Sequence, residues 1–205
     1  TGTALTLIGG LAGDALTDCD FNTAVGFASL SEDTLGSKTT AIGYQALANQ
    51  NFTTATDTFN TAVGFQSGAA VTTGVRNTLM GASAGTALTT GIRNVAVGVQ
   101  ALLADTKGNR SVAVGHNALS GQNFTTSTNS FNTAIGHEAG AQVTTGTFNT
   151  LIGALAGDAL TDSDYNVALG YQALTSDTLG SLSVAIGGFA LSAQNFTTAA
   201  NSFNV

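Results

Sequence analysis

The chain has 205 residues, of which 43% are hydrophobic and only 8% are charged, with 26 glycines, no proline and no tryptophan. Its net charge of -7 disfavours binding to nucleic acid or to an anionic membrane surface, because both need clustered Lys and Arg and the five basic residues here are scattered. The single cysteine excludes an internal disulfide framework, and no run of about 18 apolar residues that could insert into a membrane is present.

A tetrapeptide of the form (Thr/Val)-(Ala/Leu)-(Val/Ile/Leu/Met)-Gly recurs along the whole chain. Its motif glycines are Gly9, Gly26, Gly43, Gly64, Gly81, Gly98, Gly115, Gly136, Gly153, Gly170 and Gly187. They are 17 residues apart except at two intervals of 21, so the pattern repeats every 72 residues. Such self-similarity is typical of stacked repeats. We therefore predict an all-β fold, a parallel β-roll or β-solenoid of 17- and 21-residue coils, as one continuous array over residues 1–205.

Each coil is expected to open with a short strand that ends at the motif glycine. In residues 61–63, Thr61 and Val63 should point to one side and Ala62 to the other. Because the position of Val63 always holds a large aliphatic residue, we expect it to face the coil interior and Ala62 to face outward. Strands that are apolar on both sides are normally buried on both sides. The sequence thus predicts an interface with sister chains made by Leu7, Ala24, Ala41, Ala62, Leu79, Ala96, Ala113, Ala134, Leu151, Ala168 and Ala185.

Glycine and asparagine mark the corners that follow. Glycine recurs about ten residues past the motif glycine, as at Gly36 and Gly74, where the chain should turn back. Asparagine precedes most of the strands, as at Asn60 and Asn77. We expect these asparagines to stack in a ladder and to bond the coils above and below.

Every fourth coil carries four extra residues, which begin near Gln50, Gln122 and Gln194. Insertions in repeat proteins form loops that often lie on the binding face. The candidate ligand loops are Phe52, Thr53, Thr54, Phe124, Thr125, Thr126, Phe196, Thr197 and Thr198. They could grip a glycan or another fibre. The alternative is that these phenylalanines, and Phe59 with its copies Phe131 and Phe203, fold back and cap the wider coil.

The residues that could carry chemistry favour a structural interpretation. Cys19 lies far from either histidine, and a catalytic thiol needs a base nearby. His116 and His137 occupy the same site on adjacent coils, which suggests a shared metal, but the aromatic residues at equivalent sites favour a packing slot. The Asp14, Asp18 and Asp20 group recurs in one of its two copies only, which favours solvated turns over calcium. We expect no catalytic residue, no metal and no cofactor.

The strand motifs resemble the head repeats of YadA-type trimeric autotransporter adhesins. The match covers Asn-Thr-Ala-Val-Gly at Asn22–Gly26 and Asn60–Gly64, Asn-Val-Ala-Val-Gly at Asn94–Gly98, and Ser-Val-Ala-Ile-Gly at Ser183–Gly187. Similar repeats occur in phage tail fibres. The resemblance implies a left-handed parallel β-roll, a parallel homotrimer, and a tip or sides that bind host surfaces. Coils of that family are shorter than 17 residues, so a wider cross-section is expected.

These observations lead to a function without catalysis. We expect a structural repeat segment of an extracellular trimeric fibre, at a cell surface or on a virion, whose partners are its own copies and a host glycan or protein. The alternatives are a phage tail-fibre shaft and an ice- or surface-binding solenoid, the latter suggested by paired threonines such as Thr72-Thr73 and Thr89-Thr90. Because Thr1-Gly2 aligns with Thr73-Gly74, and Asn204-Val205 begins another strand, we expect a longer natural protein.

Overall fold

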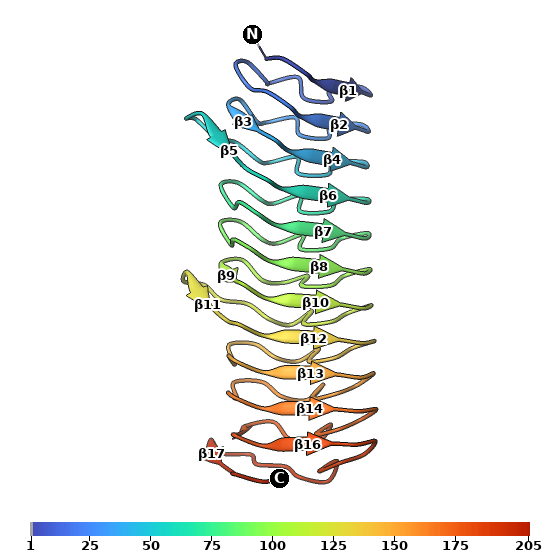
Figure 1. The fold of residues 1–205 in the computed structure, drawn as a ribbon, viewed down its shortest axis with the longest axis vertical. Helices are drawn as coiled ribbons and strands as arrows, with labels where there is room; N and C mark the ends of the chain where they lie inside the picture. Colours follow the sequence, from blue (N-terminus) through green and yellow to red (C-terminus); the bar gives the residue numbers. More distant parts are fainter. Residues whose placement is uncertain (1) are drawn as a thin grey trace.

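A computed structural model describes residues 2–205, and Thr1 lies outside the described residues. The chain is a parallel β-solenoid of about 12 turns (Figure 1). The coils stack along the long axis with the two termini at opposite ends. The prediction of an all-β stacked array is confirmed, and residues 2–205 include no helix of the length and apolarity that a membrane span requires.

One long parallel sheet runs the length of the solenoid, with one three-residue strand from each coil. Neighbouring strands pair in the same register throughout, as in Thr61↔Thr78, Ala62↔Leu79 and Val63↔Met80. Equivalent residues therefore form straight columns along the axis. The strands, in spatial order, are β1 (Thr6–Ile8), β2 (Thr23–Val25), β4 (Thr40–Ile42), β6 (Thr61–Val63), β7 (Thr78–Met80), β8 (Val95–Val97), β10 (Val112–Val114), β12 (Thr133–Ile135), β13 (Thr150–Ile152), β14 (Val167–Leu169) and β16 (Val184–Ile186).

The two faces of this sheet are the reverse of the prediction. The middle residue of each strand points into the solenoid, so Ala62 and Leu79 are fully buried within a single chain. The first and third residues face outward, and Met80 and Ile135 are among the exposed ones. The residues predicted for the interface between chains are therefore wrong, because nearly all of them lie in the core of a single chain. The buried members are Ala24, Ala41, Ala62, Leu79, Ala96, Ala113, Ala134, Leu151, Ala168 and Ala185, while Leu7 in the first coil is 40% exposed.

The narrow interior explains why alanine occupies the inward position. In many coils a fully buried leucine four residues past the motif glycine, such as Leu47 or Leu102, fills the space beside the strand. Where two successive coils carry glycine at that position, as at Gly68 and Gly85, one strand residue enlarges to leucine instead. A Cβ on Gly85 would lie 2.9 Å from Leu79 Cδ2, and one on Gly68 would lie 2.6 Å from Leu79 Cδ1. Leu79 thus occupies the volume that both glycines leave, which keeps the core at close packing.

The asparagine corners form the predicted ladder. Asn77 Nδ2 donates to the carbonyl of Gly91 (2.9 Å), while its Oδ1 accepts from the backbone N–H of Asn94 (2.9 Å). Asn60 makes the same bonds one coil earlier. Because these side chains are buried, each bond replaces one that water would otherwise make. The prediction of a ladder is confirmed.

The three long coils widen the solenoid on one side. Their extra residues form small projections along one edge of the stack (Figure 1). Each projection contains a two-residue strand that pairs in parallel with the preceding coil. The pairs are β3 (Gly36–Ser37) with β5 (Thr56–Asp57), β9 (Gly108–Asn109) with β11 (Thr128–Asn129), and β15 (Gly180–Ser181) with β17 (Ala200–Asn201).

Candidate functional site

The projecting loops expose threonines but not the phenylalanines that precede them. Phe52 is 7% and Phe124 5% exposed, so both pack into the wide coil and cap it. Phe196 in the last long coil is half-buried. The hydroxyl-bearing residues that follow, Thr53, Thr54, Thr125, Thr126, Thr197 and Thr198, are exposed. Of the predicted ligand loops, the threonines remain free to contact a partner.

The second phenylalanine of each long coil behaves in the opposite way. Phe59 is 50% and Phe131 43% exposed, so neither caps the coil as the alternative interpretation expected. Both belong to a column of outward-facing residues that we call the asparagine-side column. Each member lies directly before the corner position that is often asparagine and, except for Phe203, two residues before a strand of the long sheet. Its members have φ between 50° and 62°, and they are Ala4, Phe21, Lys38, Phe59, Arg76, Arg93, Arg110, Phe131, Phe148, Tyr165, Leu182 and Phe203.

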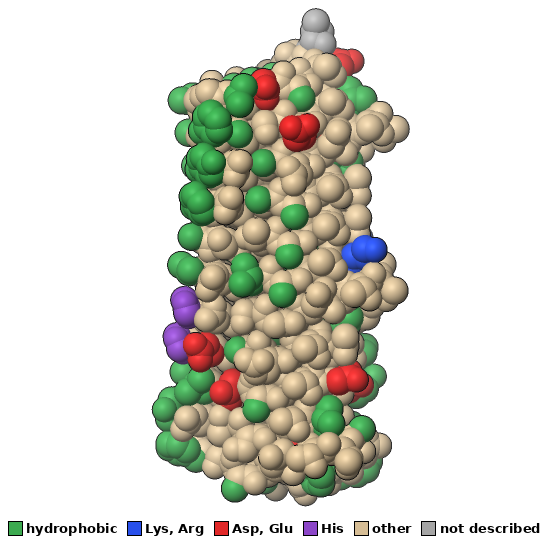
Figure 2. Space-filling view, turned by 180° about the vertical axis from the view of Figure 1, so that it is seen from behind, with side chains coloured by type: hydrophobic (Ala, Val, Ile, Leu, Met, Phe, Trp, Pro, Cys, Tyr) green, Lys and Arg blue, Asp and Glu red, His purple; other side chains and the backbone are tan. Residues whose placement is uncertain are grey.

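A second outward column follows the motif glycines on the other side of the sheet. This glycine-side column consists of Gly10, Phe27, Tyr44, Phe65, Ala82, Val99, His116, His137, Ala154, Tyr171 and Gly188. Figure 2 shows hydrophobic side chains along one edge of the molecule, with the two histidines in the same row. Tyr44 and Phe65 stack with centroids 5.3 Å apart, as do Phe148 and Tyr165 of the other column at 4.8 Å. Stacking covers the ring faces, so these columns present ring edges to solvent.

Three buried carboxylates, Asp33, Asp105 and Asp177, lie in the coils that precede the long ones. In the middle copy, Asp105 Oδ1 accepts from the backbone N–H groups of Gly108 (3.0 Å) and Phe124 (3.1 Å), and Oδ2 accepts from Gln122 Nε2 (2.6 Å). Burial raises the pKa of Asp105 above its usual value. Because the chain's own donors occupy the carboxylate, we interpret this cluster as a structural polar core that specifies where a long coil follows.

We expect Asp105→Asn to destabilise the chain by about 1–3 kcal/mol, the cost of a buried polar group without a partner. The new amide N–H₂ would face Gln122 Nε2. A flip of the Gln122 amide would not relieve this contact without breaking another hydrogen bond, because Gln122 Oε1 accepts from Asn132 Nδ2 (2.9 Å). Chemical denaturation of the variant and the original chain, in one buffer at the same pH, would measure the change in the free energy of unfolding.

The compensating variant is Asp105→Asn with Gln122→Glu, which moves the carboxylate to residue 122. The double change keeps one carboxyl group in the cluster. One oxygen of the relocated carboxyl group can accept from the new amide and the other from Asn132 Nδ2. Stability should return toward that of the original chain. Glu32→Gln, at an exposed site, is the control for loss of charge alone. A double variant as unstable as Asp105→Asn would contradict this account of the cluster.

The candidate calcium residues do not converge on a common point. Asp20 Oδ1 accepts from both the N–H and the hydroxyl of Thr3 (2.7 and 2.6 Å), and these bonds lower the pKa of Asp20. In the other copy, Asp164 bonds Thr147 and Asp162 bonds the Thr145 hydroxyl (2.6 Å). These hydrogen bonds join adjacent coils, so the aspartates stabilise the stack of coils.

Cys19 is buried, and burial raises the pKa of its thiol. Its equivalent in the third super-repeat is Ser163, whose buried hydroxyl has no hydrogen-bond partner among the described residues. This site therefore suits a small, weakly polar side chain. A raised thiol pKa is the reverse of what a cysteine nucleophile requires.

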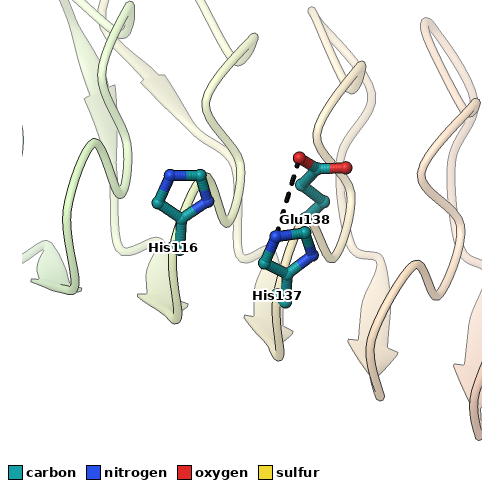
Figure 3. Close-up of side chains that lie close together, drawn as sticks. All are labelled: His116, His137 and Glu138. Atoms are coloured by element: carbon teal, nitrogen blue, oxygen red, sulfur yellow. Dashed lines mark ion pairs between the residues drawn. The ribbon is translucent and has the colours of Figure 1, made fainter.

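One group of side chains has the composition of a metal site. Among residues 2–205, the set of three in which histidine, cysteine or carboxylate ligand atoms all lie within 4.8 Å of one another is His116, His137 and Glu138. The imidazoles stack with centroids 5.2 Å apart at 12°, and His137 Nε2 lies 3.8 Å from Glu138 Oε1 (Figure 3). Sequence reasoning paired the histidines but missed Glu138. The signal was its position directly after His137.

Comparison of this chain with protein-family models, curated proteins and solved structures found no match in any of the three.

Proposed function

We propose that this chain is a structural and adhesive segment of an extracellular fibre, in which three parallel copies pack through the outer sheet face. We define that face as the first and third residues of the eleven strands of the long sheet. These positions hold only Thr, Val, Ile, Leu and Met, without a single charge. This uncharged face is the observation that carries the proposal, because a sheet face in contact with water normally carries polar and charged residues.

The size of the face also supports a partner. Eleven strands spaced about 4.8 Å apart and about 10 Å wide give a surface of roughly 480 Å² before the flanking columns are added. The largest apolar patch on a typical monomeric protein is about 300–600 Å², and such a patch is often functional. Ile42 is 37%, Met80 42% and Leu169 43% exposed in the single chain. Burial of these side chains against sister chains would remove the patch from water.

The resemblance to YadA-type head repeats favours three copies and a left-handed coil, as we propose here. Phage tail-fibre shafts with similar repeats are the alternative setting for the same assembly. In either case the segment supplies length and stiffness at a cell surface or on a virion. The exposed threonines of the projecting loops, such as Thr53 and Thr125, recur every four coils and are the surface we propose for host glycan or protein contact. The role we propose involves no catalysis.

The trimer is tested by placing charge on the outer sheet face. We expect the original chain to show about three times its mass of 20.3 kDa by light scattering. Val97→Lys combined with Val114→Glu should reduce the mass to that of one chain. Within one chain the two residues are paired neighbours, so opposite charges are tolerated. In a parallel trimer each would meet its own copies, and like charges repel.

The matched control for this prediction is Thr53→Lys with Thr125→Glu, which adds the same charges to the exposed loops. That variant should keep the mass of the original chain. Circular dichroism should show that all three proteins retain their strands. A stable, dispersed monomer of the original chain would count against the proposed fibre.

A second candidate function rests on the same face. Thr6, Thr23, Thr40, Thr61 and Thr78 form an unbroken row on five successive coils, and a regular array of threonines on a flat sheet is suited to an ice surface. The row is interrupted by Val95 and Val112. Thermal hysteresis of a monomeric sample would favour this function over the trimer, because trimer assembly would cover the threonines.

A further inference from the structure

His116 and His137 are fixed side by side by the sheet itself. They follow the motif glycines Gly115 and Gly136 at the ends of β10 and β12, whose last residues pair directly. Both imidazoles are exposed, and their centroids are 5.2 Å apart. Glu138 lies on the same coil as His137 with φ of 55°, which turns its carboxylate back toward His137 Nε2 at 3.8 Å (Figure 3).

The first super-repeat provides an internal comparison. There the equivalent residues are Tyr44, Phe65 and Gln66, none of them a good metal ligand. Their rings stack in the same way, with centroids 5.3 Å apart and planes at 9°. The backbone slot is therefore the same in both copies, and stacking alone is satisfied by Tyr and Phe. All three positions change together to ligand-bearing side chains in the second copy.

We propose that His116, His137 and Glu138 form a binding site for a first-row transition-metal ion of the zinc, nickel or copper class. Imidazole suits these ions, whereas calcium and magnesium prefer oxygen ligands alone. Zinc bonds of about 2.0–2.1 Å in a tetrahedral site hold their ligand atoms about 3.4 Å apart. The three ligand atoms lie within 4.8 Å of one another. Rotation of the two exposed imidazoles and of the half-buried Glu138 side chain covers the difference, because the paired strands already hold the two backbones one sheet spacing apart.

Two chemical consequences follow from this arrangement. Two imidazoles and one carboxylate leave the fourth position of a tetrahedral ion for water or for a ligand from another molecule. Bound metal also joins adjacent coils, since His116 belongs to one coil and His137 with Glu138 to the next. The site stands independently of the proposed fibre, because all three ligands come from one chain.

The test is calorimetric titration of the untagged chain with Zn²⁺ in a buffer that does not chelate metals. We expect one ion per chain, and at least tenfold weaker binding for His116→Ala and for His137→Ala. The matched control combines His116→Tyr, His137→Phe and Glu138→Gln. It recreates the side chains of the first super-repeat, so it keeps the stacked slot and the fold, and it should abolish the site.

A second variant tests whether the same three ligands create a metal site when they are placed in the first super-repeat. Tyr44→His, Phe65→His and Gln66→Glu together should raise the stoichiometry from one ion per chain to two. Zn²⁺ should also shift the imidazole NMR signals of both histidines in the original chain. The proposal is overturned if the control triple variant binds Zn²⁺ as tightly as the original chain, or if the imidazole signals do not respond.

Discussion

Gly98→Ala is expected to destabilise the solenoid by roughly 2–6 kcal/mol. Gly98 has φ of +135°, a conformation that costs a residue with a side chain about 1–3 kcal/mol. In addition, a Cβ at this position would lie 2.5 Å from the carbonyl oxygen of Gly115 in the next coil. That contact is with backbone, which cannot rotate away, and overpacking of this kind adds about 1–3 kcal/mol. Urea denaturation followed by circular dichroism would measure the change.

Substitutions at two other glycines separate the conformational cost from the steric cost. Gly187 has φ of +119° but nothing within 4 Å of its added Cβ, so Gly187→Ala should show the conformational cost alone. Gly10 lies outside the left-handed region, and its added Cβ would be 3.5 Å from Phe27 Cδ2, an ordinary contact. Gly10→Ala should therefore be close to neutral. Equal effects at Gly98 and Gly187 would show that contact between coils is not the reason for the motif glycine.

Leu79→Ala is expected to cost about 2–5 kcal/mol, the usual range for a fully buried leucine. Leu79 is 0% exposed and fills the space beside two glycines, Gly68 and Gly85. The surrounding coils cannot collapse into the cavity, because hydrogen bonds between coils fix their spacing. The same denaturation experiment, with the midpoint and slope fitted separately, would measure the loss.

A partner substitution tests the size match directly. Gly85→Leu alone should also be destabilising, because the new side chain meets Leu79 Cδ2. Combined with Leu79→Ala it recreates the arrangement of Ala96 and Leu102 in the following coil, where Leu102 has φ of 53°. The double variant should be more stable than the sum of the two single effects predicts, by about 1–3 kcal/mol. Additive effects would contradict the exchange of volume between the two positions.

The spacing of the motif glycines was sufficient to predict the stacked coils and their common register. Each motif glycine from Gly9 to Gly170 approaches the backbone of its counterpart in the next coil, so the coils rise equally whether they have 17 or 21 residues. The asparagine corners were predictable for a similar reason. A buried Asn that repeats at the coil period lies next to its counterparts in the adjacent coils, and Asn77 bonds Gly91 and Asn94 of the next coil as expected.

The direction of the strand faces was not predictable from side-chain size. Ala62 and Val63 are both apolar, and alternation distinguishes two faces without saying which is inside. The useful signal was covariation within the chain: Leu79 appears where two successive coils carry glycine, Gly68 and Gly85, instead of leucine four residues past the motif glycine. Only residues that share one enclosed volume exchange size in this way, which would have placed Ala62 and Leu79 in the core.

The burial of the phenylalanines in the long coils was also not predictable from the sequence. Phe52 and Phe59 are seven residues apart in the same coil, yet one is buried and the other exposed. Their directions depend on the backbone at each site, and Phe59 has φ of +52°, which no sequence pattern indicated. Glu138, the third residue of the metal candidate, was not predicted, because only the backbone at this residue shows that its carboxylate turns toward His137.

The size match around Leu79 and the polar core at Asp105 both restrict how the rod can change length. A coil fits its neighbours only when its core residues complement theirs, so removal of one 17-residue coil would place unlike cores in contact. Removal or duplication of a whole 72-residue block keeps the pattern of core residues in phase, because Gly9, Gly81 and Gly153 are equivalent. Solenoids that keep this pattern would therefore differ in length in steps of about 19 Å, four strand spacings.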